Sequence, residues 1–358
     1  MRRLIALAAL AANGAYAQNT TVYGVIDQAV EHLSGGGLSI TRLPGVTSST
    51  PSRLGFRGSE DLGGGLRAVF TLEMGIAPDA GGLNQGGRVF GRQSFVGLSG
   101  PWGTLSLGRQ YTMLFWSQLD SGTVGPNLFG ASALDSYLPN ARVDNSIAYR
   151  GTFSGFTAGA TYSLGRDTVN AGPTPAGTNC AGESATDAQA CREWSAMLKF
   201  DDKTWGVSAA VDEIRGGPGA FAGLTRSALT DRRSALGGWA RFDKLKLGAG
   251  LLARRNQAST ATPKSTLWSA GAGYELTPQF LLEGEYFKLD FKNSVNMANL
   301  WVMRGTYSFS KRTAVYATAG RVNNDGTLAM SVSSGASGTN PVAGGSQTGI
   351  AAGIRHSF

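Results

Sequence analysis

The chain has 358 residues, of which 52 are glycine, 42% are hydrophobic and only 16% are charged, with a formal net charge of +8. Glycine is about twice as frequent as in an average protein, which argues against a helical protein because glycine destabilises helix interiors. With two His and two Cys, the chain has too few ligands for a His/Cys zinc site, and His32 and His356 lie at opposite ends, which argues against an enzyme built on a Ser-His-Asp triad.

The N-terminus has the pattern of a secretory signal peptide. Arg2 and Arg3 precede an apolar run over residues 4–12, and Ala-Tyr-Ala at 15–17 suits cleavage. The apolar run is about half as long as the ~18 residues that a membrane-spanning helix needs. We therefore expect residues 1–17 to be removed and residues 18–358 to form one exported domain.

The dominant period of the remaining chain is two. Apolar and polar residues alternate over 156–164, 205–212 and 245–254, which predicts strands with one apolar and one polar face. Strands of a soluble β-sandwich show the same alternation, so the connections between strands are needed to distinguish a sandwich from a membrane barrel. Short turns such as 61–65, 100–103 and 243–244 alternate with long polar segments near 34–51, 78–87, 111–141, 165–191, 213–230, 254–264 and 323–345. Short turns at one end and long loops at the other are typical of an outer-membrane barrel.

The segments between these connections number about 16, which is an even number, as a barrel with both ends in the periplasm requires. Sixteen strands of about ten residues need ~160 residues to cross a bilayer, roughly half of the chain. We predict an all-β fold: a closed, antiparallel transmembrane β-barrel of about 16 strands, wide enough to leave an aqueous channel.

Four stretches carry a resemblance to a known family: 21–27, 52–66, 310–316 and the C-terminal 349–358. Together they resemble the general porins of Gram-negative bacteria, in particular the trimeric 16-stranded porins of β-proteobacteria. The resemblance implies a homotrimeric pore in the outer membrane, a third extracellular loop that folds inward, and neither catalysis nor an organic cofactor. The Cys-containing segment 165–191 departs from most members.

The arginines are the candidate constriction residues, because a pore selects by the charges at its narrowest point. Arg53 and Arg57 share one face of a predicted strand. Arg92 precedes a strand in which Phe95 is expected on the lipid side, and Arg142 stands where the chain re-enters the wall. By resemblance, Arg53, Arg92 and Arg142 match the arginines that line the constriction, and guanidinium groups favour anions. The alternative for each arginine is a solvated charge without a special role, and Arg88 is expected at the rim.

The segment 110–141 is too apolar for an exposed loop, which agrees with the inward-folding loop of the family. We expect its acids Asp120 and Asp135 to face the wall arginines across the opening, although Asp135 could instead be a helix cap or a surface acid. Three further acids, Asp212, Glu283 and Glu285, are expected in the lumen and could offset the arginines.

Other predictions concern assembly and the loops. Cys180 and Cys191 are expected to form a disulfide in an oxidising compartment, with free thiols as the alternative. By resemblance, Phe358 is a signal for the barrel-assembly machinery, and the loop Gly75–Gly87 latches over a neighbouring subunit. Tryptophans are expected in interfacial girdles, namely Trp102, Trp205, Trp239, Trp268 and Trp301.

The sequence as a whole predicts a pore for passive diffusion of small hydrophilic solutes, with a weak preference for anions. Expected partners are outer-membrane lipids and lipopolysaccharide. Nucleic acid is not expected, because the basic residues form no compact segment. Two alternatives stay open: a substrate-specific channel, and a surface-recognition or adhesive barrel that conducts little.

Overall fold

The computed structural model describes residues 19–46, 49–125, 129–167, 179–220, 223–334 and 338–358. The predicted signal peptide, residues 1–17, lies outside the described residues. In the described part of the chain, every helix is too short or too polar to cross a membrane.

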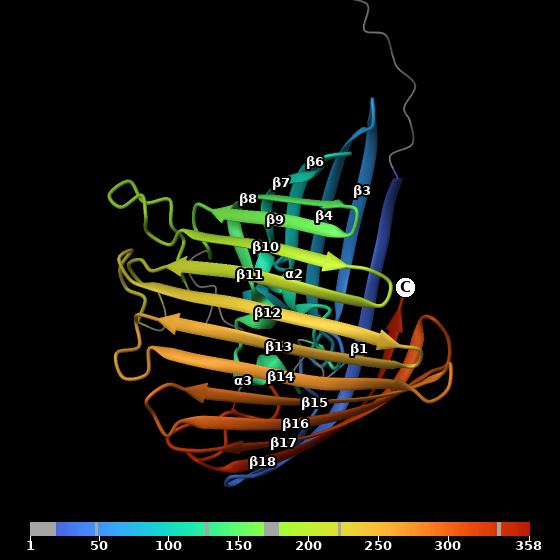
Figure 1. Ribbon diagram of the computed structural model, residues 1–358, viewed down its shortest axis with the longest axis vertical. Helices are drawn as coiled ribbons and strands as arrows, with labels where there is room; N and C mark the ends of the chain where they lie inside the picture. The colour runs from blue at the N-terminus through green and yellow to red at the C-terminus, as the bar shows by residue number, and fades with distance from the viewer. Residues whose placement is uncertain (1–18, 47–48, 126–128, 168–178, 221–222, 335–337) are drawn as a thin grey trace, which may run out of the picture.

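Long strands account for most of the described residues (Figure 1). Sixteen of them are long: β1 (Asn19–Gly35), β3 (Arg53–Gly63), β4 (Leu66–Ala77), β6 (Gln93–Gly100), β7 (Gly103–Tyr111), β8 (Arg142–Phe153), β9 (Phe156–Ser163), β10 (Glu193–Asp201), β11 (Trp205–Arg215), β12 (Thr230–Phe242), β13 (Leu245–Asn256), β14 (Lys264–Glu275), β15 (Phe280–Phe291), β16 (Met297–Ser308), β17 (Thr313–Asn324) and β18 (Ser346–Ser357). Strands β2 (Leu38–Arg42) and β5 (Gly82–Leu83) are short, as are α1 (Asn84–Gly87), α2 (Met113–Gln118), α3 (Ala131–Leu134) and a 3-10 turn at Leu138–Asn140.

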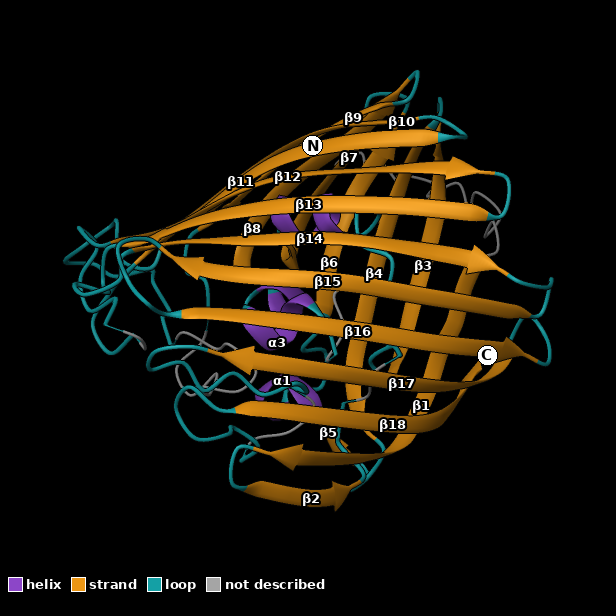
Figure 2. Ribbon diagram, turned by 60° about the horizontal axis from the view of Figure 1, so that its bottom comes forward, coloured by secondary structure: helices purple, strands orange, loops and turns teal. Residues whose placement is uncertain are grey.

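The sheet closes on itself through β1. Neighbouring strands pair antiparallel around the wall, and β1 pairs with both β3 and β18, so that Val25 lies opposite Arg53 on one side and Ser357 on the other. Gly24 and Phe358 complete the seam by exchanging backbone hydrogen bonds of 3.1 Å in each direction. Figures 1 and 2 show the wall curving round to meet itself. The predicted closed 16-stranded antiparallel barrel is confirmed.

The wall has an apolar face and a polar face. In β9, the side chains of Phe156 and Tyr162 are exposed while the alternate Thr161 and Ser163 are buried. We call the face with the exposed side chains the apolar face, because it carries the large exposed hydrophobic residues of the other strands as well. This two-residue alternation matches the prediction from sequence.

Trp239 departs from the predicted girdle. Trp102, Trp205, Trp268 and Trp301 are exposed large side chains, as expected at an interface. Trp239 instead follows Gly237 on the polar face, where its Nε1 donates a 3.1 Å hydrogen bond to Asp201 and Lys246 lies 5.9 Å from its ring. Its indole N–H has a carboxylate partner there, which explains the orientation.

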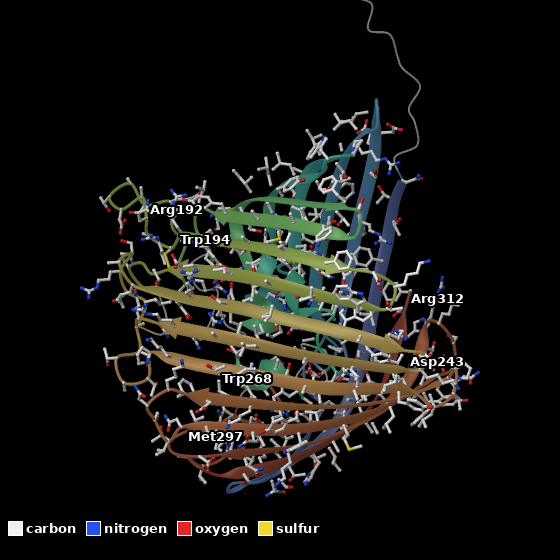
Figure 3. The ribbon with its side chains drawn as sticks, viewed as in Figure 1. Arg192, Trp194, Asp243, Trp268, Met297 and Arg312 are labelled. Carbon is white, nitrogen blue, oxygen red and sulfur yellow. A yellow bond between two sulfur atoms is a disulfide. The ribbon has the colours of Figure 1, made fainter. Side chains whose placement is uncertain are left out.

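The two ends of the barrel differ. One end has tight turns, such as 63–65, where Gly63, Gly64 and Gly65 all have positive φ, a conformation that disfavours any side chain. The other end has the long connections. Figure 3 shows Asp243 and Arg312 at the first end and Arg192 at the second.

The main hydrophobic core involves the long connection between β7 and β8. Met113, Leu114, Phe129 and Leu138 of this connection are buried. They belong to one cluster with side chains from the polar faces of the wall, including Met197, Ala235, Leu252, Phe287, Leu300 and Val322. The apolar side chains of this connection, which the sequence shows to be unsuited to an exposed loop, therefore pack against β10–β17.

Candidate pore constriction

The connection between β7 and β8, residues 112–141, is hydrogen-bonded to distant wall strands. The Met113 backbone N–H donates to Ser195 Oγ of β10 (2.9 Å), and Ser208 Oγ of β11 donates to the Ser117 carbonyl oxygen (2.8 Å). Both serines lie on the polar face, since they alternate with exposed apolar residues. The segment is therefore attached to the polar face of the wall.

Glu285 provides a second attachment. Its carboxylate accepts hydrogen bonds of 2.9 Å from the backbone N–H groups of both Thr123 and Val124. Glu283, two residues earlier, forms a 2.8 Å ion pair with Arg304. Both carboxylates thus have polar partners, which reduces their capacity to offset the candidate arginines.

Three of the four candidate arginines of the predicted constriction lie together, and the fourth, Arg57, lies outside their cavity. Arg53 begins β3, Arg92 directly precedes β6 and Arg142 begins β8. All three line one cavity of about 300 Å³, with Glu73 of β4 and Tyr111 of β7. Three separate strand ends thus bring three guanidinium groups to one place.

Glu73 and Tyr111 hold the guanidinium groups in position. The Glu73 carboxylate lies 2.7 Å from Arg92 Nε and 3.6 Å from Arg53 Nε. The Tyr111 hydroxyl oxygen accepts hydrogen bonds from Arg92 (2.8 Å) and Arg142 (2.6 Å). Sequence reasoning missed both residues, although the alternation of β4 would have placed Glu73 on the polar face.

Arg142 has neutral hydrogen-bond partners. Besides Tyr111, it donates to the Asn140 side-chain oxygen at 3.1 Å, and its guanidinium carbon lies 4.3 Å from the centre of the Tyr111 ring. The side chain is 2% exposed. Among the described residues, no carboxylate is hydrogen-bonded to Arg142, so its positive charge is held in place by neutral groups.

The predicted pairing of acids across the opening is wrong. The segment 112–141 contributes Phe115, Leu119, Val124, Gly125 and Pro139 to the cavity, and Glu73 is its one acid among the described residues. Asp120 forms an ion pair with Lys199 of β10 instead, and Lys199 also lies 2.8 Å from Asp201. Lys199 and Arg233 pair with the loop acids, so in the part of the chain that the structure describes no acid of the segment 112–141 faces Arg53, Arg92 or Arg142 across the cavity.

Asp135 is likewise engaged elsewhere. Its carboxylate accepts two hydrogen bonds from Arg233 of β12, at 2.9 and 3.2 Å, and both side chains are buried. Burial by itself raises the pKa of Asp135, but the adjacent Arg233 guanidinium outweighs it and holds the pKa below its usual range. Asp135 follows the last residue of α3 and anchors the segment to the wall.

A second, larger cavity of about 620 Å³ adjoins the first, since Gln93 and Tyr111 line both. Arg57 and Arg150 both line the larger cavity. The Arg57 guanidinium lies 5.2 Å from the centre of the Tyr23 ring, and the Arg150 guanidinium lies 3.9 Å from the centre of the Trp116 ring. Sequence reasoning missed Arg150, although the alternation of Ser146 and Ala148 in the same strand places it on the polar face. The basic path therefore extends beyond the three clustered arginines.

The prediction that Phe95 of β6 lies on the lipid side is wrong. Phe95 lines the larger cavity, while Val96 and Leu98 are the exposed apolar side chains. Arg92 lies outside the strand, so alternation does not relate its direction to that of Phe95. Arg88, predicted at the rim, lies 3.7 Å from both Asp144 and Asp167.

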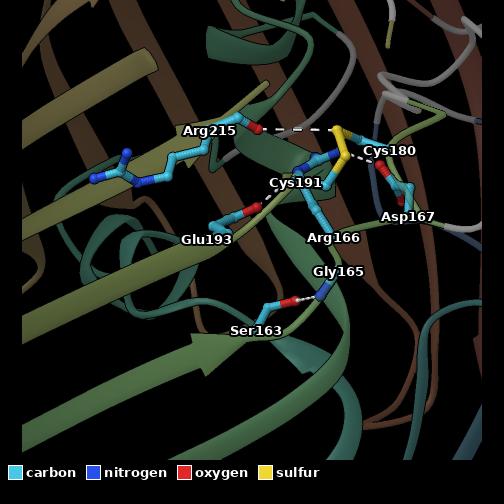
Figure 4. Close-up of a disulfide and its surroundings, with 8 residues drawn as sticks. All are labelled: Ser163, Gly165, Arg166, Asp167, Cys180, Cys191, Glu193 and Arg215. Carbon is cyan, nitrogen blue, oxygen red and sulfur yellow. Dashed lines mark hydrogen bonds and ion pairs between the residues drawn. A yellow bond between two sulfur atoms is a disulfide. The ribbon is translucent and has the colours of Figure 1, made fainter. Parts of the chain in front are cut away.

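Cys180 and Cys191 form a disulfide next to a buried charge cluster (Figure 4). The backbone N–H of Arg166 donates to the Cys191 carbonyl oxygen at 3.1 Å, and its side chain forms ion pairs with Asp167 and Glu193. The Arg166 guanidinium lies 4.9 Å from the ring of Tyr137, in the segment 112–141. The disulfide-closed segment is thus connected to the segment beside the arginine cavity.

The described residues contain no cluster of three or more His, Cys, Asp or Glu side chains that could hold a metal ion.

A comparison with protein families decides the class of the protein. The family model for Gram-negative porins matches residues 4–327. The chain belongs to the Gram-negative porin family. It is an outer-membrane protein and a passive channel rather than an enzyme.

Individual relatives agree with the family. The porin is 29% identical to outer membrane porin protein 32 of Delftia acidovorans, over all of this chain and 99% of the relative. Its fold is similar to that of an anion-selective porin from Comamonas acidovorans, with a TM-score of 0.72 and 24% identity over 95% of this chain and all of the other. It is also similar to the outer-membrane protein OmpT of Vibrio cholerae in a trimer form, with a TM-score of 0.66 and 17% identity over 95% and 99% of the two chains.

Proposed function

We propose that this porin passes small hydrophilic solutes with a weak preference for anions, and that Arg53, Arg92 and Arg142 form its selective constriction. The observation that carries the proposal is the charge of the smaller cavity. Three guanidinium groups line it with one carboxylate, that of Glu73, among the described residues. A net positive site of this kind concentrates anions and repels cations.

The proposal includes the segment 112–141 as the opposite side of the constriction, folded into the lumen. Its hydrogen bonds to Ser195, Ser208 and Glu285 on the polar face support this placement. Asp120 and Asp135 are paired with Lys199 and Arg233, which supports a role in fixing the segment rather than in forming a negative side of the opening. Arg57 and Arg150 would extend the anion path through the larger cavity.

The assembly is proposed to be a homotrimer, with the loop Gly75–Gly87 latching over a neighbouring subunit. The trimer form of the similar OmpT supports a trimer, and the latch is proposed by resemblance to the family. Outer-membrane lipids and lipopolysaccharide would contact the apolar face, and the barrel-assembly machinery would insert the chain.

The reversal potential of the purified porin in a planar bilayer under a salt gradient tests the selectivity. We expect anion preference in the wild type and a reduced or inverted preference in Arg53→Ser/Arg92→Ser/Arg142→Ser. A unit charge about 7 Å from an ion in water changes its energy by ~0.6 kcal/mol, which corresponds to about threefold in partitioning per arginine. The single variant Arg142→Gln tests the same point without leaving Glu73 unpaired.

A control removes two positive charges away from the cavity lining. Lys203→Ser/Lys244→Ser changes exposed lysines in the short turns and should leave the reversal potential within a small fraction of the wild-type value. Conductance with equal selectivity in the arginine variants would place the filter elsewhere. A folded trimer that does not conduct would favour a recognition barrel, and saturable transport of one solute would favour a substrate-specific channel.

A further inference from the structure

The larger cavity lies between the smaller cavity and the short turns. It shares Tyr111 and Gln93 with the smaller cavity, and it extends to Thr104, the second residue of β7 after the turn that joins β6 and β7. The three clustered arginines therefore lie on one side of this cavity, and the barrel end with the tight turns lies on the other. In the proposed function, a solute that passes the arginines enters the larger cavity before it reaches that end.

Two arginines of the larger cavity have hydrogen-bond donors that no neighbouring group uses. Arg57 of β3 and Arg150 of β8 are exposed, and alternation places both on the polar face. In the part of the chain that the structure describes, neither guanidinium has a hydrogen bond or an ion pair, and no Asp or Glu lines this cavity. The charge of these two arginines is therefore available to an anionic solute.

Trp116 of α2 holds the Arg150 side chain in position. The guanidinium carbon lies 3.9 Å from the centre of the Trp116 ring, and Trp116 packs edge-on against Tyr111 and Phe115, with 5.8 and 5.7 Å between ring centres. A guanidinium stacked on an aromatic face keeps the N–H groups at its edges free, and their planar arrangement matches the two oxygens of a carboxylate. The wall and the segment 112–141 together therefore orient Arg150 for a carboxylate.

Phe95 of β6 gives the same cavity an aromatic surface. The residue opposite Phe95 on β7 is Gly108, and the next residue of β6 on the polar face is Gly97. Neither glycine has a side chain that could cover the Phe95 ring from these directions. The cavity volume of about 620 Å³ is within the usual range for small-molecule sites, so the cavity has room for a ring beside Phe95.

We propose that the larger cavity is a binding site for aromatic carboxylates, with the carboxylate on Arg150 and the ring against Phe95. The inference rests on the proposed function, in which solutes reach this cavity through the lumen. Small inorganic anions can use only the charge of Arg57 and Arg150, whereas an aromatic carboxylate also buries apolar area against Phe95. The porin therefore retains this class of anion longer than it retains chloride or acetate.

Fluorine NMR of the detergent-solubilised porin, titrated with 4-fluorobenzoate, tests the proposal. We expect a dissociation constant of about 1 mM for the wild type, in keeping with so small a ligand. Arg150→Gln should bind this probe about tenfold more weakly, because the substitution removes the charged partner of the carboxylate. Phe95→Leu should bind it about threefold more weakly, because the contact between the two rings is lost.

Arg67→Gln is the matched control, because Arg67 is exposed on the polar face of β4 and lines neither cavity. It removes the same charge and should bind 4-fluorobenzoate as the wild type does. The wild type should bind 4-fluorobenzyl alcohol, which has the ring without the charge, about tenfold more weakly than 4-fluorobenzoate. Acetate should displace 4-fluorobenzoate only at much higher concentrations than benzoate does. Equal affinity of the wild type and Arg150→Gln, or equally ready displacement by acetate and benzoate, would overturn the proposal.

The titration is separable from the selectivity test. It measures binding to the folded porin whether or not the channel conducts, and the reversal potential measures selectivity without an aromatic solute. Anion preference without binding of 4-fluorobenzoate would reject the aromatic carboxylate site alone. Binding of 4-fluorobenzoate at Arg150 without anion preference would reject the constriction formed by Arg53, Arg92 and Arg142 alone.

Discussion

At the scale of single residues, the Tyr111 hydroxyl organises the charge of the cavity. One oxygen accepts hydrogen bonds from both Arg92 and Arg142, which keeps two like charges close together. The Tyr111 ring stacks on Phe115 of α2 with 3.7 Å between ring centres. Arg142, Tyr111 and Phe115 therefore form a continuous stack from the wall to the segment 112–141, in which the guanidinium benefits from the ring face.

Glu73→Gln should increase the anion preference. Among the described residues, Glu73 is the one carboxylate that lines the smaller cavity, and the substitution removes its charge. The glutamine oxygen can still accept a hydrogen bond from Arg92 or from the Tyr23 hydroxyl, 3.0 Å away. We expect the anion-to-cation permeability ratio to rise by about threefold, measured as the reversal potential. Glu60→Gln, an exposed acid of the same hairpin, is the control with the same charge change. An unchanged ratio in Glu73→Gln would show that ions do not pass this carboxylate.

At the scale of elements, the segment 112–141 is fixed by charges as well as by apolar contacts. Arg233 binds Asp135 of the segment and also Asp231 of its own strand, at 3.0 Å. The Tyr137 ring lies 4.4 Å from the same guanidinium. Burial, followed by the nearby Asp212 and Glu193, raises the pKa of Tyr137 well above its usual value, so its hydroxyl stays protonated and acts as a hydrogen-bond donor.

Asp135→Asn should weaken the attachment of the segment in a pH-dependent way. Because the pKa of Asp135 is lower in the folded protein, its charge stabilises the fold fully above the ordinary carboxyl range, and this stabilisation is lost as the pH falls through the depressed pKa. We expect a loss of about 1.5–3 kcal/mol at pH 7, seen as a lower thermal unfolding temperature.

At a pH below the depressed pKa of Asp135, the wild type and Asp135→Asn should unfold at nearly the same temperature, because protonated aspartic acid resembles asparagine. Asp120→Asn is the control, since Asp120 is 45% exposed and pairs with Lys199, so its loss at pH 7 should be smaller. A difference for Asp135→Asn that persists unchanged into acid would contradict the role of the Asp135 charge.

At the scale of the whole molecule, closure of the barrel depends on the last residue. Phe358 exchanges two backbone hydrogen bonds with Gly24, and its ring occupies the space that a side chain at position 24 would need. The ring is also 49% exposed on the apolar face. A structural role at the seam and a role as an assembly signal are therefore both compatible with its position.

Phe358→Ala separates the two roles. Loss of about half of the buried area of a phenylalanine corresponds to about 1–2 kcal/mol, so the variant should still fold into lipid vesicles without other proteins. We expect a much smaller fraction of heat-modifiable, folded porin in the outer membrane of cells. Phe309→Ala, an exposed aromatic residue near the short turns, is the control and should assemble normally. Equal assembly of both variants in cells would show that Phe358 is not the signal.

Local pattern was sufficient for the architecture. Alternation in a strand depends only on the residues of that strand, so the strands, their number and the polar-face positions of Arg53 and Arg57 followed from the sequence. Alternation does not give the direction of a side chain that lies just outside a strand. Arg92 precedes β6, so the direction of its side chain could not be inferred from that of Phe95 within the strand. The girdle prediction for Trp239 failed although the alternation of β12 places this residue on the polar face, where Asp201, 38 residues away in the chain, accepts its hydrogen bond.

The sequence by itself determined the closed, two-faced barrel and a supply of arginines at strand ends, because these depend on short-range periodicity and turn chemistry. Only the tertiary structure decided which charges meet. Asp135 and Arg233 are 98 residues apart in the chain, and Thr123 and Glu285 are 162 apart. Such pairs depend on how a long connection crosses to distant strands, and many basic residues of similar local pattern were available as partners. The positive charge of the arginine cavity results because Asp120 and Asp135 pair with basic residues elsewhere on the wall.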